Sequence, residues 1–295
     1  MQKRESHLVP ALPERIRLSD YLGGIFVSIP SRKGMKKAIL KGLVLVNEKP
    51  AQTGLYLEGG EQIDLLEEDR ELPIFKQSLE VLFEDEHIAV INKPAGLLVS
   101  GNALRTVVNA LPFNLVPSRE SDGLLRPQPA HRLDYPTQGL LLVGKTHRSI
   151  TALNQAFASR DIQKTYHAVT IGEMLAEGAC TIPIENKPAH SGFRVIERQD
   201  SPKYGALNLV KLQPYTGRRH QLRIHCAQLG NPILGDKEYG KPGLIQRGNG
   251  LYLCATQLDF KHPVTGEALH FHRPLPKKIR RIFGEIEHKN QQSNQ

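Results

Sequence analysis

The chain has 295 residues, a length that suggests two domains. Its composition, 39% hydrophobic and 23% charged, is that of an ordinary globular protein and excludes collagen-like, coiled-coil and mainly disordered chains. The formal net charge of +9 fits an anionic partner, most simply a nucleic acid, although such a charge also serves solubility alone.

Cysteine usage and hydropathy bear on the compartment. Cys180, Cys226 and Cys254 are far apart and form no C-x-x-C pair, so neither a disulfide framework nor a zinc site is expected. No apolar run approaches the roughly 18 residues of a membrane span, and the N-terminal segment lacks the apolar core of a signal peptide. We therefore expect a soluble, cytoplasmic protein with no membrane partner.

A small N-terminal domain is predicted over residues 14–66, after a loose polar extension over residues 1–13. An amphipathic run over 18–25 precedes a helical run over 31–42. Two short strands, LVLVN and EQIDLLE, follow the helical run. The acidic stretch EEDRELP ends in proline and indicates a linker over residues 67–78.

The remainder, residues 79–285, is predicted to form one larger domain. Apolar runs between glycine and proline turns predict the strands IAVI, LLLV, HAVTI and LNLVKL, and helical periodicity predicts helices over 147–159 and 220–229. This mixture is typical of an α/β or α+β fold with a large, mostly antiparallel sheet flanked by helices. Residues 286–295 are expected to form a disordered tail.

Several common catalytic motifs are missing from the sequence. There is no G-x-x-x-x-G-K-[ST] or G-x-G-x-x-G phosphate loop and no G-x-S-x-G elbow. His270 and His272 lack a convincing third ligand, so we interpret them as surface histidines. No metal and no nucleotide cofactor is expected.

The most informative stretch is HRLDYPTQGLLLVGKT, residues 131–146. A polar loop with Arg132 and Asp134 leads into an apolar strand, a position where a side chain can face a cleft. Taken alone, an Arg-x-Asp turn is more typical of a surface ion pair than of a catalytic site.

Its context favours catalysis, because HRLD-x-x-T-x-G before an apolar strand resembles the central motif of the RluA-type pseudouridine synthases. The stretches DEHIAVINKPAGLLVS, KTYHAV, TGRRHQLRIHCAQLGNPILGDKEYG and LDFKHPVTGE resemble the other motifs of that family, in the same order. The N-terminal pattern similarly resembles an S4 RNA-binding domain. The resemblance implies the pseudouridine synthase fold and the isomerisation of a uridine in ribosomal or transfer RNA. It implies no cofactor and no protein partner, and we expect a monomer.

The resemblance also assigns roles to single residues. Asp134 matches the family's nucleophile, and Arg223 matches the arginine that pairs with it. Tyr166 matches the tyrosine that stacks on the target base. Arg132 matches the residue that enters the RNA stack when the uridine is flipped out. The alternatives are a core aromatic for Tyr166, a phosphate contact or solvent exposure for Arg223, and a surface ion pair for Arg132.

The helical run of the S4-like segment is basic, with no acid over residues 31–41 and with positions 33, 37 and 41 on one face. A solvated face is the simple interpretation, whereas the S4 resemblance favours phosphate contacts, which give affinity and salt dependence but little sequence choice. The predicted RNA-binding residues are Arg32, Lys33, Lys36, Lys37 and Lys41.

The chain departs from the family pattern at Gln138, where many members have serine, and at Tyr135, where a basic residue is more usual. These departures leave loop geometry and RNA preference open. Two other functions remain: a non-catalytic RNA-binding protein that retains the fold, and a hydrolase, which needs a second carboxylate near Asp134. We interpret Asn92, Lys93 and Pro94 as a structural turn.

Overall fold

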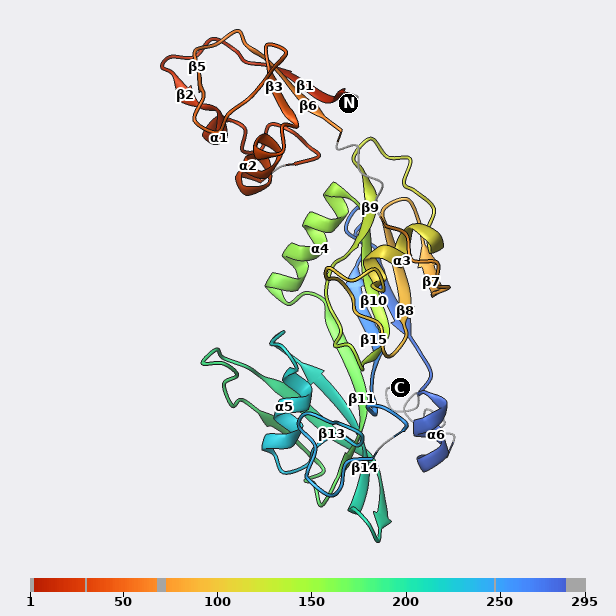
Figure 1. Cartoon of the computed structure of the whole chain (residues 1–295). Coiled ribbons are helices and arrows are strands. Elements are labelled where there is room, and N and C mark those ends of the chain that lie inside the picture. The colour runs from red at the N-terminus through yellow and green to blue at the C-terminus, as the bar shows by residue number, and fades with distance from the viewer. Residues whose placement is uncertain (1–2, 30, 68–72, 247, 285–295) are drawn as a thin grey trace. The chain divides into compact units, whose positions relative to one another are not determined.

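The computed structural model describes residues 3–29, 31–67, 73–246 and 248–284. The chain divides into two compact units, Met1–Pro73 and Ile74–Gln295, each with its own hydrophobic core (Figure 1). The division falls inside the segment predicted as a linker, of which residues 68–72 lie outside the described part of the chain. The predicted tail over 286–295 also lies outside it.

The first unit is a small α+β body. Its elements are β1 (Lys3–Leu8), β2 (Ile16–Arg17), α1 (Leu18–Tyr21), α2 (Arg32–Leu40), β3 (Val44–Val46), β4 (Lys49–Pro50), β5 (Tyr56–Leu57) and β6 (Gln62–Leu66). Four strands form an antiparallel sheet in the order β1-β6-β3-β4, and β2 pairs with β5. The predicted helix and the two predicted strands are confirmed as α2, β3 and β6.

The prediction of a loose extension over residues 1–13 is wrong for β1, which pairs with β6. Asp64 of β6 anchors this strand, because it accepts a hydrogen bond from Ser6 Oγ at 2.6 Å and lies 2.7 Å from Lys3 Nζ. Charged residues dominate the edge strand, so it carries no alternating hydrophobic pattern that could have been recognised. Its pairing with β6, rather than its own composition, makes it a strand.

The second unit is built on one large sheet. Its elements are β7 (Glu80–Glu84), β8 (Ile88–Lys93), α3 (Val107–Asn114), β9 (Gly123–Pro129), β10 (Gln138–Thr146), α4 (His147–Ser159), β11 (Gln163–Ile171), β12 (Glu177–Cys180), β13 (Ser191–Ser201), β14 (Gly205–Pro214), α5 (Gln221–Gln228), β15 (Leu253–Lys261), β16 (Ala268–His272) and α6 (Lys277–Phe283). The sheet runs β12-β13-β14-β11-β15-β10-β8-β7, with β16 beside β15 and β9 beside β10. The β10–β15 pair is parallel and the other named pairs are antiparallel, which confirms the predicted fold class.

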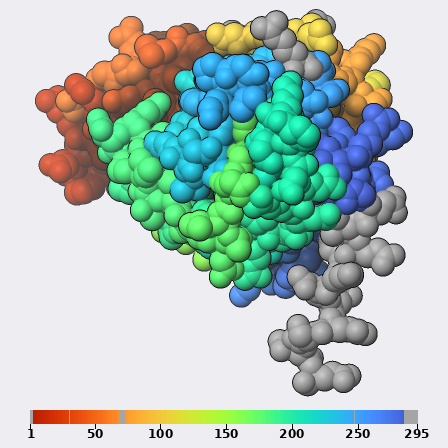
Figure 2. All heavy atoms as spheres, turned by 90° about the horizontal axis from the view of Figure 1, so that it is seen from below, coloured from red at the N-terminus to blue at the C-terminus, as the bar shows by residue number. Residues whose placement is uncertain are grey.

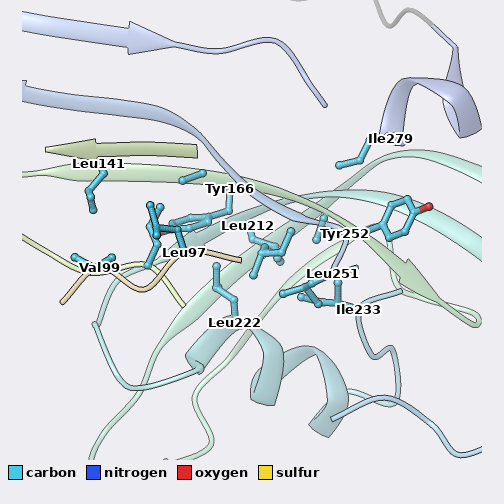
Figure 3. Packing of buried hydrophobic residues seen from close by; sticks show 14 of the residues in the cluster. Leu97, Val99, Leu141, Tyr166, Leu212, Leu222, Ile233, Leu251, Tyr252 and Ile279 are labelled. Carbon is cyan, nitrogen blue, oxygen red and sulfur yellow. The ribbon is translucent and has the colours of Figure 1, made fainter. Parts of the chain in front are cut away.

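The central strands are buried on both faces, which explains why they are continuous apolar runs in the sequence. Ile88 of β8 belongs to a core cluster with Leu153 of α4, whereas its neighbour Ala89 belongs to a second cluster with Leu222 of α5. Figure 1 shows α4 alongside β9 and β10, and Figure 3 shows Leu222 pointing toward Leu212 of β14. Helices therefore cover the sheet from both faces, as predicted.

The helices predicted over 147–159 and 220–229 are confirmed as α4 and α5. A capping box explains the clear start of α4, because Thr146 Oγ1 accepts from the Ser149 N–H while Ser149 Oγ accepts from the Thr146 N–H. In contrast, α3 was not predicted, since it contains Pro112, a helix-breaking signal. No helix in the described ranges is long and apolar enough to cross a membrane.

Candidate active site

A cavity of about 260 Å³ lies where the loop before β10, strand β11 and the start of α5 meet. Arg132, Asp134 and Tyr166 line this cavity. Arg223 of α5 is 3.9 Å from Asp134 at the closest nitrogen–oxygen approach. Figure 2 shows one face of the second unit, on which the green, teal and cyan segments of β11 to α5 are prominent. The fold thus brings together four residues that are spread over 92 positions of the sequence, from 132 to 223.

Ala255 of β15 is the junction that brings these segments together. It pairs with Gly139 of β10 on one side and with Tyr166 of β11 on the other. Gly139 has a φ of 124°, and a Cβ there would lie 2.1 Å from the Ala255 oxygen, so glycine is required. The register of β11 against β15 shifts between Thr165 and Tyr166, a bulge that can redirect a side chain toward a site.

Asp134 stands at the first position of a tight turn, closed by a 3.0 Å hydrogen bond from the Thr137 N–H to the Asp134 carbonyl. Its side chain is 18% exposed and lies 3.8 Å from Nε2 of His220 and 3.9 Å from Nη1 of Arg223. Both separations exceed hydrogen-bond length. The carboxylate is therefore held beside a guanidinium and an imidazole while its oxygens stay accessible from the cavity.

Arg223 is close to Asp134 as predicted, but its direct partners are two other acids. Its Nε and Nη2 atoms donate to the two oxygens of Asp236, both at 2.8 Å, and Nη2 also donates to Glu238 at 3.0 Å. Burial alone lowers the pKa of Arg223, but the bond to Asp236 and its charge, then the charge of Asp134 and the bond to Glu238, outweigh burial and raise that pKa. Burial likewise raises the pKa of Asp236, and its bonds to Arg223 and to two backbone N–H groups lower it further than burial raises it. Arg223 is thus a fixed buried cation rather than the exclusive partner of Asp134.

Tyr166 is 8% exposed and belongs to the main core cluster, while one part of it lines the cavity (Figure 3). Burial raises the pKa of its hydroxyl, and the charge of Asp134 raises it further, so the phenol stays neutral. Tyr166 is therefore both a core aromatic and a residue of the cavity wall. Lys164, two residues earlier on β11, also lines the cavity, and burial lowers its pKa.

His220 was missed in the sequence. It stands just before α5 with a φ of 55°, in the left-handed region where non-glycine residues are uncommon. Its Nδ1 atom is 2.9 Å from the Tyr239 hydroxyl, which fixes the ring beside Asp134. The carboxylates of Asp236 and Glu238 are also brought to the site, where both accept hydrogen bonds from Arg223. The polar clusters RRHQLR and GDKEY inside the arginine motif were the available signal for all of these residues.

Lys93, interpreted as part of a structural turn, is completely buried. Its Nζ atom donates to the carbonyls of Leu97 at 2.7 Å, Pro94 at 2.9 Å and Tyr135 at 3.4 Å. Burial lowers the pKa of Lys93 to about 8, and the charge of Asp134 opposes this shift. Lys93 is the last residue of β8, so the prediction of a turn at this residue is wrong. Its bonds tie the first motif to the loop that carries Asp134, which is a structural role.

The remaining predicted residues lie on the surface. Arg132 is exposed at the rim of the cavity. In the first unit the predicted RNA-binding residues of α2 and Lys41 are exposed, but Arg32 pairs with Asp20 of α1, an acid outside the basic run. Across the described part of the chain, no group of three or more His, Cys, Asp or Glu could hold a metal ion.

Comparisons with known proteins agree on one family. The family model described as RNA pseudouridylate synthase matches residues 87–228. The chain is 34% identical to the ribosomal large subunit pseudouridine synthase D of Vibrio cholerae, over 88% of each protein. It is 31% identical to an uncharacterized RNA pseudouridine synthase of Aquifex aeolicus, over 93% of this chain and 95% of that protein. The solved structure of human RNA pseudouridylate synthase domain containing 1 is similar in fold, with a TM-score of 0.55 and 24% identity over 69% of this chain and 86% of that one.

Proposed function

Because the chain belongs to the RNA pseudouridylate synthase family and is therefore an isomerase acting on RNA, we propose that it converts a uridine of ribosomal RNA to pseudouridine with Asp134 as nucleophile. The observation that carries this proposal is the meeting of Asp134, Tyr166 and Arg223 at one cavity. The name of the Vibrio relative supports a ribosomal target, and transfer RNA is the alternative substrate. A non-catalytic protein would not need all three side chains together.

The reaction exchanges one bond to the sugar for another. The bond between uracil N1 and ribose C1′ breaks, the uracil turns, and a bond between C5 and C1′ forms. C5 loses a proton and N1 gains one, so atoms and charge balance. A carboxylate can attack either the ribose or the pyrimidine ring as a nucleophile. Asp134 is suited to this role, because its oxygens lie near His220 and Arg223 but beyond hydrogen-bond distance of both.

Tyr166 and Arg223 serve the same carboxylate in different ways. The neutral ring of Tyr166 offers a flat face for the uracil without adding negative charge next to Asp134. Arg223 is a positioning residue that keeps positive charge near Asp134. Its bidentate bond to Asp236 prevents it from closing onto the nucleophile.

The uridine must leave the RNA stack before it can reach Asp134. Flipping a base costs a few kcal/mol. The cavity of about 260 Å³ suits one extruded nucleoside rather than a duplex, which supports this step. Arg132 stands exposed at the rim, and its planar guanidinium can stack in the vacated position or bind a phosphate.

The first unit is proposed to be an S4-like domain that holds RNA by its phosphates. The exposed lysines of α2 lie opposite the buried side chains of Met35, Ala38 and Ile39, so the helix presents one basic face. The proposed enzyme acts as a monomer in the cytoplasm. Its three cysteines are free and buried, which supports a reducing compartment.

The substitution Asp134→Asn tests the nucleophile. Ribosomal and transfer RNA transcripts tritiated at uracil C5 release tritium when the new bond forms, so turnover can be followed on both. We expect wild-type protein to release tritium from ribosomal RNA in the presence of EDTA, and D134N to release none while binding RNA normally. Asp161→Asn, at an exposed aspartate, is the matched control and keeps full activity. Turnover by D134N rejects the nucleophile, and release only from transfer RNA rejects the proposed target.

A further inference from the structure

Thr137 carries a buried hydroxyl without a partner. The residue is 2% exposed, and within the described ranges its Oγ1 atom has no hydrogen-bond partner. Other buried polar atoms share this condition, but Thr137 is the one among their residues that lines the cavity beside Asp134. An unpaired buried hydroxyl lowers stability, so such a group in the wall of a cavity is a candidate for binding a ligand.

Two other polar residues of the cavity wall, Thr216 and His220, have hydrogen-bond partners within the protein. Thr216 Oγ1 donates to Gln221 at 2.6 Å and accepts from the His190 N–H at 2.9 Å. His220 is held by the Tyr239 hydroxyl at 2.9 Å. Thr216 and His220 are therefore satisfied within the protein, whereas the buried hydroxyl of Thr137, three residues after the proposed nucleophile on the same tight turn, is not.

We propose that the Thr137 hydroxyl is a substrate-binding group that forms a hydrogen bond with the flipped uracil. This inference rests on the proposed function. A hydroxyl can both donate and accept, so it can serve a carbonyl oxygen or a ring N–H of the base. The two carbonyls of uracil flank N3, and turning the ring about the N3–C6 axis exchanges them as it exchanges N1 with C5. A donor that binds one carbonyl before the turn meets the other carbonyl after it, so one hydroxyl can hold both substrate and product.

The substitution Thr137→Val removes the hydroxyl and keeps the shape. We expect T137V to unfold at the same temperature as wild type or higher, because it deletes an unpaired buried polar group. Its single-turnover rate at saturating ribosomal RNA should fall about tenfold, the effect of one lost hydrogen bond. RNA affinity should stay within twofold, since phosphate contacts dominate it. Thr137→Ser retains the hydroxyl and should restore most of the rate.

Thr216→Val is the matched control for stability, because its hydroxyl already has two protein partners and its loss should lower the unfolding temperature. A T137V protein that turns over at the wild-type rate overturns the inference. So does an equal loss of rate in T137S, or a fall in unfolding temperature that accompanies the loss of rate. Wild-type activity in the same assay separates this failure from failure of the proposed function, which would leave wild-type protein inactive on RNA.

Discussion

The positive charge beside Asp134 comes from Arg223, whose guanidinium lies beyond hydrogen-bond distance of the Asp134 carboxylate. Arg223 is 4% exposed and sits between Asp236, its bidentate partner, and Asp134 at 3.9 Å. Since a buried guanidinium needs a carboxylate in direct contact, Asp236 satisfies Arg223 and leaves Asp134 open. Without Asp236, the nearest remaining acids for Arg223 are Glu238 and Asp134 itself. Asp236 therefore competes with Asp134 for Arg223, and this competition leaves the carboxylate of Asp134, the proposed nucleophile, accessible.

The substitution Asp236→Asn tests this dependence. Breaking a buried ion pair costs about 3–5 kcal/mol, so D236N should unfold at markedly lower denaturant concentration. At a temperature where it stays folded, its single-turnover rate should fall about tenfold or more even with RNA saturating, because Arg223 can then close onto Asp134. Denaturant unfolding and tritium release measure the two effects.

Glu238→Gln is the matched control, because Glu238 contacts the same guanidinium but its side chain is 50% exposed. An exposed pair contributes less than about 1 kcal/mol, so E238Q should change stability little. Equal losses of stability in E238Q and D236N would contradict the assignment of Asp236 as the main partner of Arg223.

The residues of the site differ in how far the sequence predicts them. Asp134, Tyr166 and Arg132 are recognisable because each stands in a short motif beside a strong apolar pattern. Asp236 stands in the polar cluster GDKEY, but its pairing with Arg223 is not recognisable from the sequence, because its position depends on a close approach between distant loops. Gly235 precedes it with a φ of 79°, and a Cβ there would lie 2.0 Å from the oxygen of Gly250. Such a contact has no local signature.

Among the elements, β10 does most to position the site. The loop before it carries Asp134. His131, at the start of that loop, contacts the strand, because its Nε2 atom accepts a hydrogen bond from the Leu142 N–H at 3.0 Å. The apolar run of β10 predicts the strand itself, whereas this side-chain anchor depends on the folded loop. Elements with exposed, alternating residues, such as β13, also lack a recognisable pattern. Strands that form continuous apolar runs, such as β8 and β10, are thus predictable from composition, whereas edge strands, side-chain anchors and the proline-containing helix α3 are not.

The anchor at His131 predicts a pH dependence. Burial lowers the pKa of His131 to about 3, with the nearby charge of Lys164 as a second cause. The ordinary value is about 6.5. Between these two values the unfolded chain binds a proton that the folded chain excludes, so stability falls as the pH drops through 6.5. The slope from this residue is at most about 1.4 kcal/mol per pH unit.

His131→Gln removes this proton linkage. H131Q should be less stable than wild type at pH 7, and its unfolding free energy should fall less between pH 7 and pH 5. Denaturant titrations at both pH values measure the difference. His270→Gln, at an imidazole that is 73% exposed, is the control and should follow the wild-type slope. A wild-type slope in H131Q would contradict the buried neutral anchor.

At the scale of the whole molecule, the proposed function divides two tasks between the two units, which have separate cores: the first unit holds RNA and the second changes it. The second unit contains every residue of the proposed chemistry, and its cavity is lined from that unit alone. The first unit contributes an exposed basic helix face on α2. Phosphate contacts give affinity without sequence information, so under the proposed function we expect the second unit to choose the uridine.

Neutralising the α2 face tests this division in the full-length protein. Lys33 and Lys37 are exposed and one helical turn apart, so both can face the same strand of RNA. Each phosphate contact contributes about 0.7–0.9 to the slope of log affinity against log salt. The double substitution Lys33→Gln, Lys37→Gln should therefore weaken RNA binding at low salt and reduce that slope by about 1–2.

Lys49→Gln, at an exposed lysine of β4 outside this face, should leave the slope unchanged. Single-turnover rates at saturating RNA should match wild type, because no residue of the cavity has changed. An unaltered slope in the double variant would mean that this face is only solvated, and a lower saturating rate would mean that the first unit takes part in the chemical step.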